Sequence, residues 1–244
     1  QLDGDLLWNY SMPPKFKRKY IKLPPHGETN VTKLAHLYRL GLRNRYGDKM
    51  QSTAGIHFNF SFSDSVIKAL GNNKTEIYLG ISRNFLRIFP LVLRLMGCSP
   101  VAHKSFLKGR SINIENLDQE DCYLPYSTSL RVSRLGYYSE EQDENFITFN
   151  SLGDYLVTIE SYINNPNEKF KDISLDLKQQ VNNGTIQMES ELYNHIRPKG
   201  IISKEIRAYN QLKENGIEYL EIRSIDLNPY SNIGISLEDV EFLE

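Results

Sequence analysis

The chain has 244 residues, of which 40% are hydrophobic and 24% are charged, and this balance predicts a globular protein with a sizeable core. Its 29 basic and 30 acidic residues give a net charge of -1, without the basic excess of proteins that bind phosphate backbones. Composition therefore argues against nucleic acid as the main partner, and we assign no function to the basic run at residues 15–22.

Cysteine content and hydropathy favour a cytoplasmic protein. Cys98 and Cys122 are too few for a disulfide framework and lack metal-ligand spacing, so we expect two structural thiols in a reducing compartment. The most apolar stretch, residues 85–102, contains two arginines and Pro90, so we do not expect it to span a membrane. No secretory leader opens the chain, and the first methionine is Met12, which predicts a processed protein or a piece of a longer one.

Apolar periodicity predicts two helices and a strand in the first part of the chain. Residues 32–47 place leucines at helical spacing, with Thr32 as the N-cap and Gly47 as the stop. Residues 54–62 alternate apolar and polar side chains, which predicts a strand. A polar turn then leads into a predicted helix over residues 76–96 that should bend at its proline.

The rest of the chain predicts one more helix and two more strands. Residues 108–144 have mixed periodicity and several turn formers, so we expect an ordered loop. Ser151 is expected to cap a helix that ends before Pro166. Residues 185–200 and 216–227 read as two strands joined by a loop and a short helix. Without repeats or a linker, the chain is expected to form a single α+β domain.

The two strongest strands each carry polar groups on one face. Because successive side chains of a strand point to opposite faces, Glu221, Arg223 and Ile225 should share one face. His57 and Asn59 share a polar face in the same way. Such faces are typical of a sheet that lines a ligand cleft. The alternative is a face exposed to water, with a structural histidine and an ion pair that contributes little stability.

Further candidates lie in segments rich in tyrosine, and they are Tyr38, Arg131, Tyr137, Glu191, Tyr193 and Arg197. For each tyrosine taken alone, packing is the commoner role. The sequence contains no Walker loop, GxGxxG, HExxH or GxSxG motif. The residues by themselves therefore indicate an anion-binding or metal-binding cleft on an antiparallel sheet.

Four long motifs carry a family resemblance, and they are LYRLGLRNRYGDKMQSTAGIHFNFSFS, LPYSTSLRVSRLGY, ESELYNHIRPK and GIEYLEIRSIDLNPYSNIG. In this order and spacing, they resemble the bacterial glutamate-cysteine ligase family of the gamma-proteobacterial type, from about Leu7 to the end of the chain. Several long motifs together are far more specific than one short pattern. The resemblance implies an α+β fold related to glutamine synthetase, a curved antiparallel sheet with helices packed on its outer face.

The resemblance also implies a reaction. Glutamate-cysteine ligases join the γ-carboxylate of glutamate to the amine of cysteine through a γ-glutamyl phosphate, in the first step of glutathione synthesis. The implied cofactor is Mg²⁺ or Mn²⁺, with ATP as co-substrate, because the crowded phosphate oxygens need divalent cations. The implied partners are L-glutamate, L-cysteine and ATP, in a cytoplasmic enzyme that we expect to be a monomer without nucleic-acid or membrane partners.

Individual roles follow from the same resemblance. Glu221 matches a metal ligand and, with Arg223, a catalytic residue, while His57 matches the histidine of the metal site. The residues implied to bind substrate are Tyr38, Leu42, Tyr137 and Tyr193 around the cysteine side chain, Arg131 at its carboxylate, and Arg197 at phosphate or substrate. Aromatic rings suit a polarizable thiol, and a guanidinium can grip a carboxylate with two hydrogen bonds.

The chain departs from the family at both ends. The family has an acidic Glu-x-Glu strand upstream and a helical segment downstream, and we expect neither in this sequence. Residues 1–244 are therefore predicted to be the central part of one ligase domain, inactive or nearly so alone. Two alternatives remain, a related carboxylate–amine ligase with another acceptor and a truncated, non-catalytic homologue that binds nucleotide or amino acid.

Overall fold

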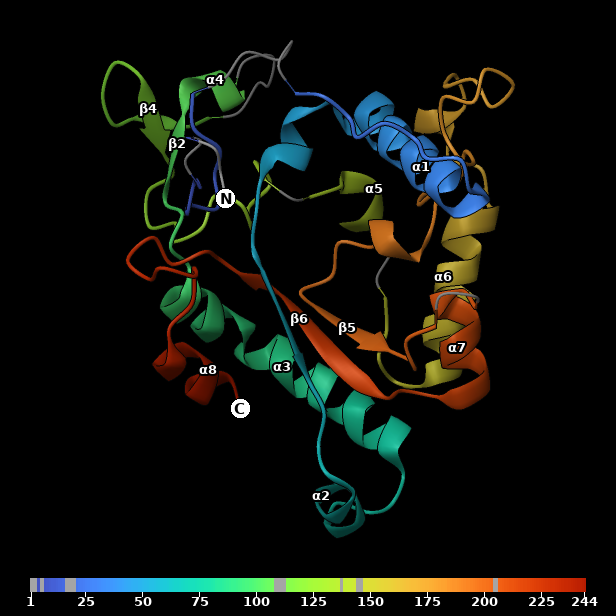
Figure 1. Cartoon of the computed structure of the whole chain (residues 1–244). Coiled ribbons are helices and arrows are strands. Elements are labelled where there is room, and N and C mark those ends of the chain that lie inside the picture. The colour runs from blue at the N-terminus through green and yellow to red at the C-terminus, as the bar shows by residue number, and fades with distance from the viewer. Residues whose placement is uncertain are drawn as a thin grey trace.

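The computed structural model describes residues 4, 7–15, 21–107, 113–136, 138–143, 147–203 and 206–244. Within these residues, Figure 1 shows two antiparallel sheets with helices around them, which confirms the expected α+β class. The strands are β1 (Ile56–Phe60), β2 (Val101–His103), β3 (Glu115–Asn116), β4 (Asp121–Tyr123), β5 (Ile196–Lys199) and β6 (Tyr219–Ile225). The α-helices are α1 (Asn30–Tyr46), α2 (Asp64–Ala69), α3 (Lys74–Met96), α4 (Lys104–Leu107), α5 (Glu140–Asp143), α6 (Leu152–Asn164), α7 (Ala208–Asn215) and α8 (Leu237–Leu243). Short 3-10 helices cover Lys49–Ser52, Glu168–Phe170 and Glu189–Glu191.

The sheet that carries the predicted site has the order β1-β6-β5, with β6 in the centre and antiparallel to both neighbours. Phe58 lies opposite Ile222, and Asn59 lies opposite Glu221. On the other side of β6, Arg197 of β5 lies opposite Glu221. Because directly paired residues point to the same face, polar side chains from three strands come together there.

An irregularity between β1 and β6 decides which face Ile225 takes. Ile56 pairs with Ile225, whereas Phe58 pairs with Ile222, so the register shifts by one residue. The extra residue in β6 resets its alternation, as a β-bulge does. Ile225 is therefore 1% exposed in the same apolar cluster as Ile222, and the prediction that it shares the face of Glu221 is wrong.

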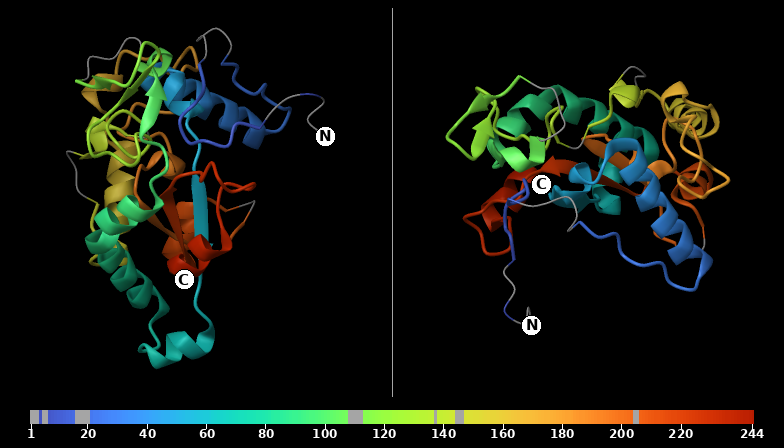
Figure 2. Two further views of the ribbon diagram at one scale, coloured as in Figure 1. Left: turned by 90° about the vertical axis from the view of Figure 1, so that its left-hand side faces the viewer. Right: turned by 90° about the horizontal axis from the view of Figure 1, so that it is seen from above.

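Helix α3 packs against β5 and β6 and covers the apolar face of this sheet (Figure 2). Asn73 caps the helix by accepting a hydrogen bond from the backbone N–H of Glu76, and the helix continues through Pro90. The predicted helix is confirmed to within two residues at its start. Buried side chains of α3, such as Leu79, join Leu220 in the main core. The expected arrangement of a helix on the outer face of the sheet is thus present.

Helix α1 begins earlier than the spacing of its leucines predicts. The side chain of Thr29 caps it by accepting a hydrogen bond from the N–H of Thr32 at 3.3 Å. Thr32 therefore lies in the first turn, and its prediction as the N-cap is wrong. The predicted stop at Gly47 is confirmed, because this glycine has a φ of +83°, which other residues adopt only with strain.

The second sheet, with the order β2-β4-β3, lies partly in the segment predicted to be a loop. Its strands are two or three residues long, too short to show a period of two in the sequence. A separate apolar cluster surrounds it, made of Met12, Ala102, Phe106, Cys122, Leu130 and Leu135. The expected structural role of Cys122 is thus explained by its burial in this second core.

The remaining elements follow the predicted order. Ser151 caps α6 by accepting a hydrogen bond from the N–H of Asp154, and the helix ends two residues before Pro166. The strand expected over residues 185–200 is confined to β5, because the residues before it form a 3-10 turn. Throughout the described ranges, no helix combines the length and the hydropathy needed to cross a bilayer.

Candidate functional site

Glu221 lies in the middle of β6, where its carboxylate meets four other ionisable side chains. Its Oε1 atom is 3.3 Å from Nδ1 of His57. Its Oε2 atom is 3.5 Å from Nε of Arg223, 3.8 Å from Nζ of Lys199 and 3.9 Å from Nη1 of Arg197. The Glu221 side chain is 11% exposed and that of His57 is 48% exposed, so the cluster opens to solvent beside the histidine.

The charges around Glu221 keep it ionised. Burial alone would raise the pKa of Glu221, but the hydrogen bond with His57 and the three neighbouring cations outweigh burial and lower the pKa to about 2. Among the residues described, none donates a hydrogen bond to the buried Oε2 atom. Three cations around one carboxylate leave this face of the sheet positive, which favours an anionic ligand.

The two guanidinium groups of the cluster are held by one carbonyl. Arg197 and Arg223 both donate hydrogen bonds to the carbonyl oxygen of Leu192, at 2.9 Å from Nη1 of Arg223. Arg197 also donates to the carbonyl of Ser190 at 3.3 Å. Both arginines are less than a tenth exposed. Groups fixed in this way need little reorganisation when negative charge develops beside them.

Glu191 anchors the segment that supplies this carbonyl. Its side chain is 0% exposed and accepts hydrogen bonds from Arg45 Nη1 at 3.1 Å and from the hydroxyl of Tyr46 at 2.8 Å. It also accepts from the backbone N–H of Gln187 at 2.8 Å. The last turn of α1 is thereby tied to the turn before β5. Glu191 therefore acts on the site indirectly, because it holds the neighbouring Leu192, whose carbonyl accepts hydrogen bonds from Arg197 and Arg223.

Arg131 is bound to the fold through most of its donors. Its Nε donates to Asp226 at 2.8 Å, and its terminal nitrogens donate to the carbonyls of Arg223 and Ile225. Gly55 lies directly against the guanidinium, where a Cβ would come within 2.5 Å of its carbon. The structure thus gives Arg131 a structural part at the end of β6, and its role at a substrate carboxylate stays a prediction.

Three of the predicted residues meet at one small cavity. Arg131, Tyr193 and Arg223 line a space of about 20 Å³ between β6 and the turn before β5, together with His195. The ring of Tyr193 also stands edge-on to Tyr46 of α1, with 6.0 Å between centroids. Arg131, Tyr193 and Arg223 thus lie close together, and their assignment to substrate or reacting groups stays a prediction.

The other residues assigned to the cysteine pocket lie on α1 or outside the described ranges. Tyr38 and Leu42 are one helical turn apart on α1, the helix whose last turn contacts Tyr193 through Tyr46. Leu42 is 8% exposed. Tyr137 lies outside the described residues. The shared pocket of these four residues remains a prediction.

His57 and Glu221 have the chemistry of ligands for a divalent cation. They offer an imidazole nitrogen and an ionised carboxylate whose Oε2 has no hydrogen-bond donor among the described residues. Over the same residues, no three His, Cys, Asp or Glu side chains gather in a way that could hold a metal ion. The pair fits a partial ligand set, and the roughly six oxygen ligands of Mg²⁺ would have to be completed by phosphate, water or further carboxylates.

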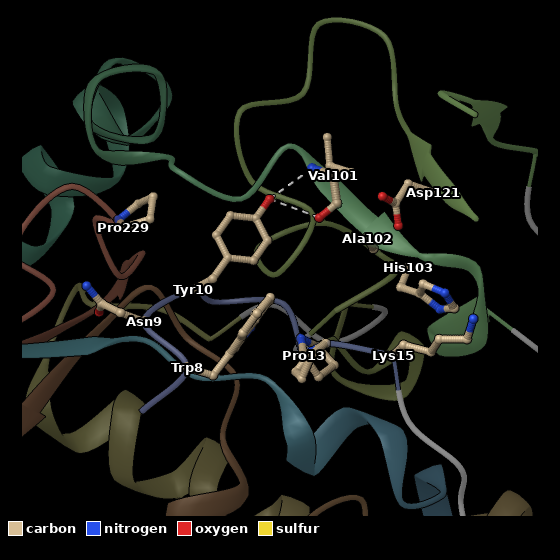
Figure 3. A pocket seen from close by; sticks show the side chains of 11 residues that line it. Trp8, Asn9, Tyr10, Pro13, Lys15, Val101, Ala102, His103, Asp121 and Pro229 are labelled. Carbon is tan, nitrogen blue, oxygen red and sulfur yellow. Dashed lines mark hydrogen bonds between the residues drawn. The ribbon is translucent and has the colours of Figure 1, made fainter. Parts of the chain in front are cut away.

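A larger cavity, of about 670 Å³, lies at the second sheet and contains none of the predicted site residues. Figure 3 shows Trp8, Pro13 and His103 on its walls. In the same view the hydroxyl of Tyr10 donates to the carbonyl of Val101 and accepts from its N–H, at 3.0 and 3.2 Å. The Tyr10 hydroxyl therefore satisfies both backbone polar groups of Val101 at the edge of β2, as a neighbouring strand would.

Two residues of the site escaped the sequence predictions. Lys199 follows Arg197 by two positions in β5, so the alternation of the strand carries the signal that would have found it. Asp226 is 2% exposed and accepts from Arg131, from the hydroxyl of Ser99 at 2.6 Å and from the N–H of Cys98 at 3.0 Å. Nothing in the local sequence marks it, because its partners are distant in the chain.

Comparison with known proteins is consistent with this geometry. The family model described as glutamate-cysteine ligase matches residues 1–244. The glutamate–cysteine ligase of Pseudomonas putida (strain W619) is 36% identical over 258 residues, which cover 100% of this chain and 49% of that protein. The enzyme of Aliivibrio salmonicida (strain LFI1238) is 40% identical over 253 residues, covering 98% of this chain and 48% of that protein. The chain thus spans about half the length of these relatives.

Solved structures show the same fold. A crystal structure of glutamate–cysteine ligase from Francisella tularensis in complex with AMP matches with a TM-score of 0.89 and 31% identity, covering 96% of this chain and 48% of that one. A bifunctional glutathione synthetase from Pasteurella multocida matches with a TM-score of 0.66 and 24% identity, which supports the fold alone. With a family match along its whole length and relatives that align to nearly all of it, the chain belongs to the glutamate-cysteine ligase family.

Proposed function

We propose that this chain supplies the reacting face of an ATP-dependent ligase that joins the γ-carboxylate of glutamate to the amine of cysteine. The observation that carries the proposal is the ionised Glu221, set among His57, Arg197, Lys199 and Arg223 on paired strands. Family membership and the AMP bound to the Francisella relative support it. The chain spans half of its relatives, so the proposal concerns the protein of family length.

The proposed reaction has two steps. A γ-carboxylate oxygen of glutamate attacks the γ-phosphorus of ATP, the bond to the bridging oxygen breaks, and ADP leaves. The amine of cysteine then attacks the carbon of the acyl phosphate, phosphate leaves with the C–O bond electrons, and the amine loses a proton. Negative charge accumulates on phosphate oxygens in both steps, so preorganised positive groups lower the barrier.

We assign different parts of this reaction to different residues of the cluster, according to their positions. Arg223 and Arg197 are already held at the Leu192 carbonyl, and we assign them to the phosphate or substrate oxygens that become more negative. Glu221 and His57 are the proposed ligands of Mg²⁺ or Mn²⁺. When bound, the divalent cation would neutralise and orient phosphate oxygens. The depressed pKa of Glu221 keeps its carboxylate available as a ligand near neutral pH.

The acceptor side of the proposal rests on the residues around Tyr193. We assign Tyr38, Leu42, Tyr137 and Tyr193 to the cysteine side chain. Arg131 is assigned to its carboxylate. Within the described part of the chain, the guanidinium makes four hydrogen bonds to Asp226, Arg223 and Ile225, so one of its five N–H groups remains for a ligand. The proposed substrates are thus L-glutamate, L-cysteine and ATP, bound by a monomer in the cytoplasm.

Release of phosphate from ATP tests the proposal. A protein of the relatives' length that contains this chain should release phosphate only when glutamate, Mg²⁺ and cysteine are all present. The chain alone should be inactive or nearly so. In the longer protein, Glu221→Gln should lower kcat on the order of 100-fold, because it removes a proposed metal ligand. Glu218→Gln, at a half-exposed position just before the same strand, is the matched control and should leave kcat unchanged.

Acceptor specificity is tested separately. Tyr193→Ala should raise KM for cysteine by about tenfold or more while KM for ATP changes little, since a lost pocket contact affects the ligand that fills it. Equal effects on both constants would remove Tyr193 from the acceptor pocket. Turnover with other amines but not with cysteine would favour a related carboxylate–amine ligase.

A further inference from the structure

Gln142, in α5, holds the backbone on both sides of Leu192. Its Nε2 atom donates a hydrogen bond to the carbonyl of Glu191 at 3.0 Å. Its Oε1 atom accepts one from the backbone N–H of Tyr193 at 2.8 Å. Because a backbone carbonyl only accepts and a backbone N–H only donates, these partners determine which end of the amide is nitrogen and which is oxygen. One side chain from α5 thus fixes the turn before β5, which lies beside it in Figure 1.

The peptide unit between Leu192 and Tyr193 connects Gln142 to the arginines of the cluster. The C=O and N–H groups of a trans peptide unit lie in one plane and point in opposite directions. The N–H of this unit is held by Gln142, and its C=O accepts hydrogen bonds from Arg197 and Arg223. Rotation of the unit would therefore move the carbonyl to which both guanidinium groups are bound. Hydrogen bonds on both sides of one peptide also polarise one another.

Both segments joined by Gln142 are anchored elsewhere in the fold. Next to it in α5, Glu141 is 8% exposed and forms an ion pair with Lys169. On the other side of the contact, Glu191 forms a fully buried ion pair with Arg45 of α1. The ionisable groups that flank the contact therefore have partners of opposite charge, and Gln142 adds hydrogen bonds without adding a charge.

The contact needs a side chain that donates and accepts at once. A leucine has about the same length as glutamine but neither donor nor acceptor, and an ionised glutamate has acceptors only. Without Gln142, the N–H of Tyr193 and the carbonyl of Glu191 would both lose a partner in a partly buried place. The turn would then be held only by the side chain of Glu191 and by the arginines that it is meant to orient.

We propose that Gln142 is a positioning residue of the ligase reaction. It orients the peptide between Leu192 and Tyr193, and through the carbonyl of this peptide it orients Arg197 and Arg223 toward the oxygens that become more negative. This role rests on the proposed function and deepens it, because it adds a residue that acts on the reacting groups through the backbone. Its effect belongs mainly to the transition state, in which the negative charge develops.

Steady-state kinetics of the family-length protein tests this role. Gln142→Leu removes both hydrogen bonds and should lower kcat about tenfold, while KM for glutamate and KM for ATP each change less than about threefold. Gln142→Glu keeps an acceptor for the N–H of Tyr193 and loses the donor to Glu191. Protonation of the introduced carboxyl restores that donor, so its kcat relative to the unaltered protein should rise as pH falls from about 8 to about 6.

The controls make the same substitutions away from the site. Gln119→Leu and Gln119→Glu, at an exposed position between β3 and β4, should match the unaltered protein at every pH. Gln142→Leu should show no recovery at low pH. Circular dichroism establishes that each variant retains the fold before kinetics are compared.

Hydrogen exchange gives a readout that needs no turnover. Followed by mass spectrometry, peptides that contain Tyr193 should exchange faster in Gln142→Leu than in the unaltered protein, because the N–H of Tyr193 loses its acceptor. Gln119→Leu should leave these peptides unchanged. Unchanged exchange in Gln142→Leu would show that Gln142 does not hold the turn and would overturn its positioning role.

The outcomes distinguish the positioning role from the proposed function. Faster exchange with an unchanged kcat in Gln142→Leu would make Gln142 merely structural, and the ligase would stand without it. Equal activity of Gln142→Glu and Gln142→Leu at every pH would also overturn the positioning role. A family-length protein that ligates nothing before any substitution would overturn the proposed function and the positioning role together.

Discussion

At the scale of single residues, the charge state of Glu221 links stability to pH. Its pKa of about 2 in the folded protein lies below the ordinary value of 4.5, so ionised Glu221 stabilises the folded state at neutral pH. This contribution is present above the ordinary pKa and is lost as the pH falls from about 5 toward 2. The shift corresponds to about 3 kcal/mol at full effect for this largely buried group.

Glu221→Gln should therefore lower the free energy of unfolding by about 3 kcal/mol at pH 7, and the difference from the unaltered chain should narrow as pH falls. Urea denaturation at several pH values measures this difference. Glu218→Gln removes a half-exposed partner of Lys74 and should cost less than about 1 kcal/mol at any pH. A difference for Glu221→Gln that stays constant with pH would show that its charge does not stabilise the fold.

Arg131 provides the second prediction at this scale. Arg131→Lys keeps the charge but cannot reach Asp226 and the two backbone carbonyls together, so it should lower the free energy of unfolding by about 2 kcal/mol. Arg134→Lys, at an exposed position nearby, should change it by less than about 0.5 kcal/mol. Equal stability of both variants in urea would assign the Arg131 guanidinium to ligand binding alone.

At the scale of elements, one buried carboxylate fixes α1 against the turn before β5. Arg45 and Glu191 form an ion pair in which both side chains are 0% exposed. Glu191→Gln would leave the Arg45 charge buried without its counter-charge, which typically costs about 3–5 kcal/mol. Hydrogen exchange should then rise in α1 and in residues 187–192 before it rises in α3. Glu168→Gln, whose carboxylate is 88% exposed, is the control that should leave exchange unchanged.

At the scale of the whole molecule, α3 exposes a row of apolar side chains beside Arg87 and Arg94 on the face turned away from the sheet. Ile88, Leu91 and Leu95 recur at helical spacing and are 55%, 56% and 54% exposed. An apolar row of this kind favours association. In this chain produced alone, as distinct from the family-length protein that we propose to be a monomer, Leu91→Lys should reduce self-association in sedimentation experiments. Val157→Lys, at an isolated exposed position on α6, should not. The same association in both variants would place the contact elsewhere, such as at the open edges of the sheet.

Local sequence patterns predicted some structural features of this protein and not others. The polar faces of β1 and β6, the helix α6 and the stop at Gly47 were predicted, because alternation, capping and glycine conformation act over a few residues. The second sheet was missed, since strands of two or three residues carry no readable period. Ile225 was placed on the wrong face, because a bulge depends on the partner strand. Lys199 was passed over although its strand position carried the signal.

The sequence by itself determined which side chains share a strand face, where several helices begin or end, and, through long motifs, membership of the glutamate-cysteine ligase family. The tertiary structure decided which of these side chains meet. Arg131 and Asp226 are 95 residues apart, and Arg45 and Glu191 are 146 apart. Such pairs form only when distant segments pack together. Burial and charge pairing decide which pairs form, and a short stretch of sequence contains no information on either.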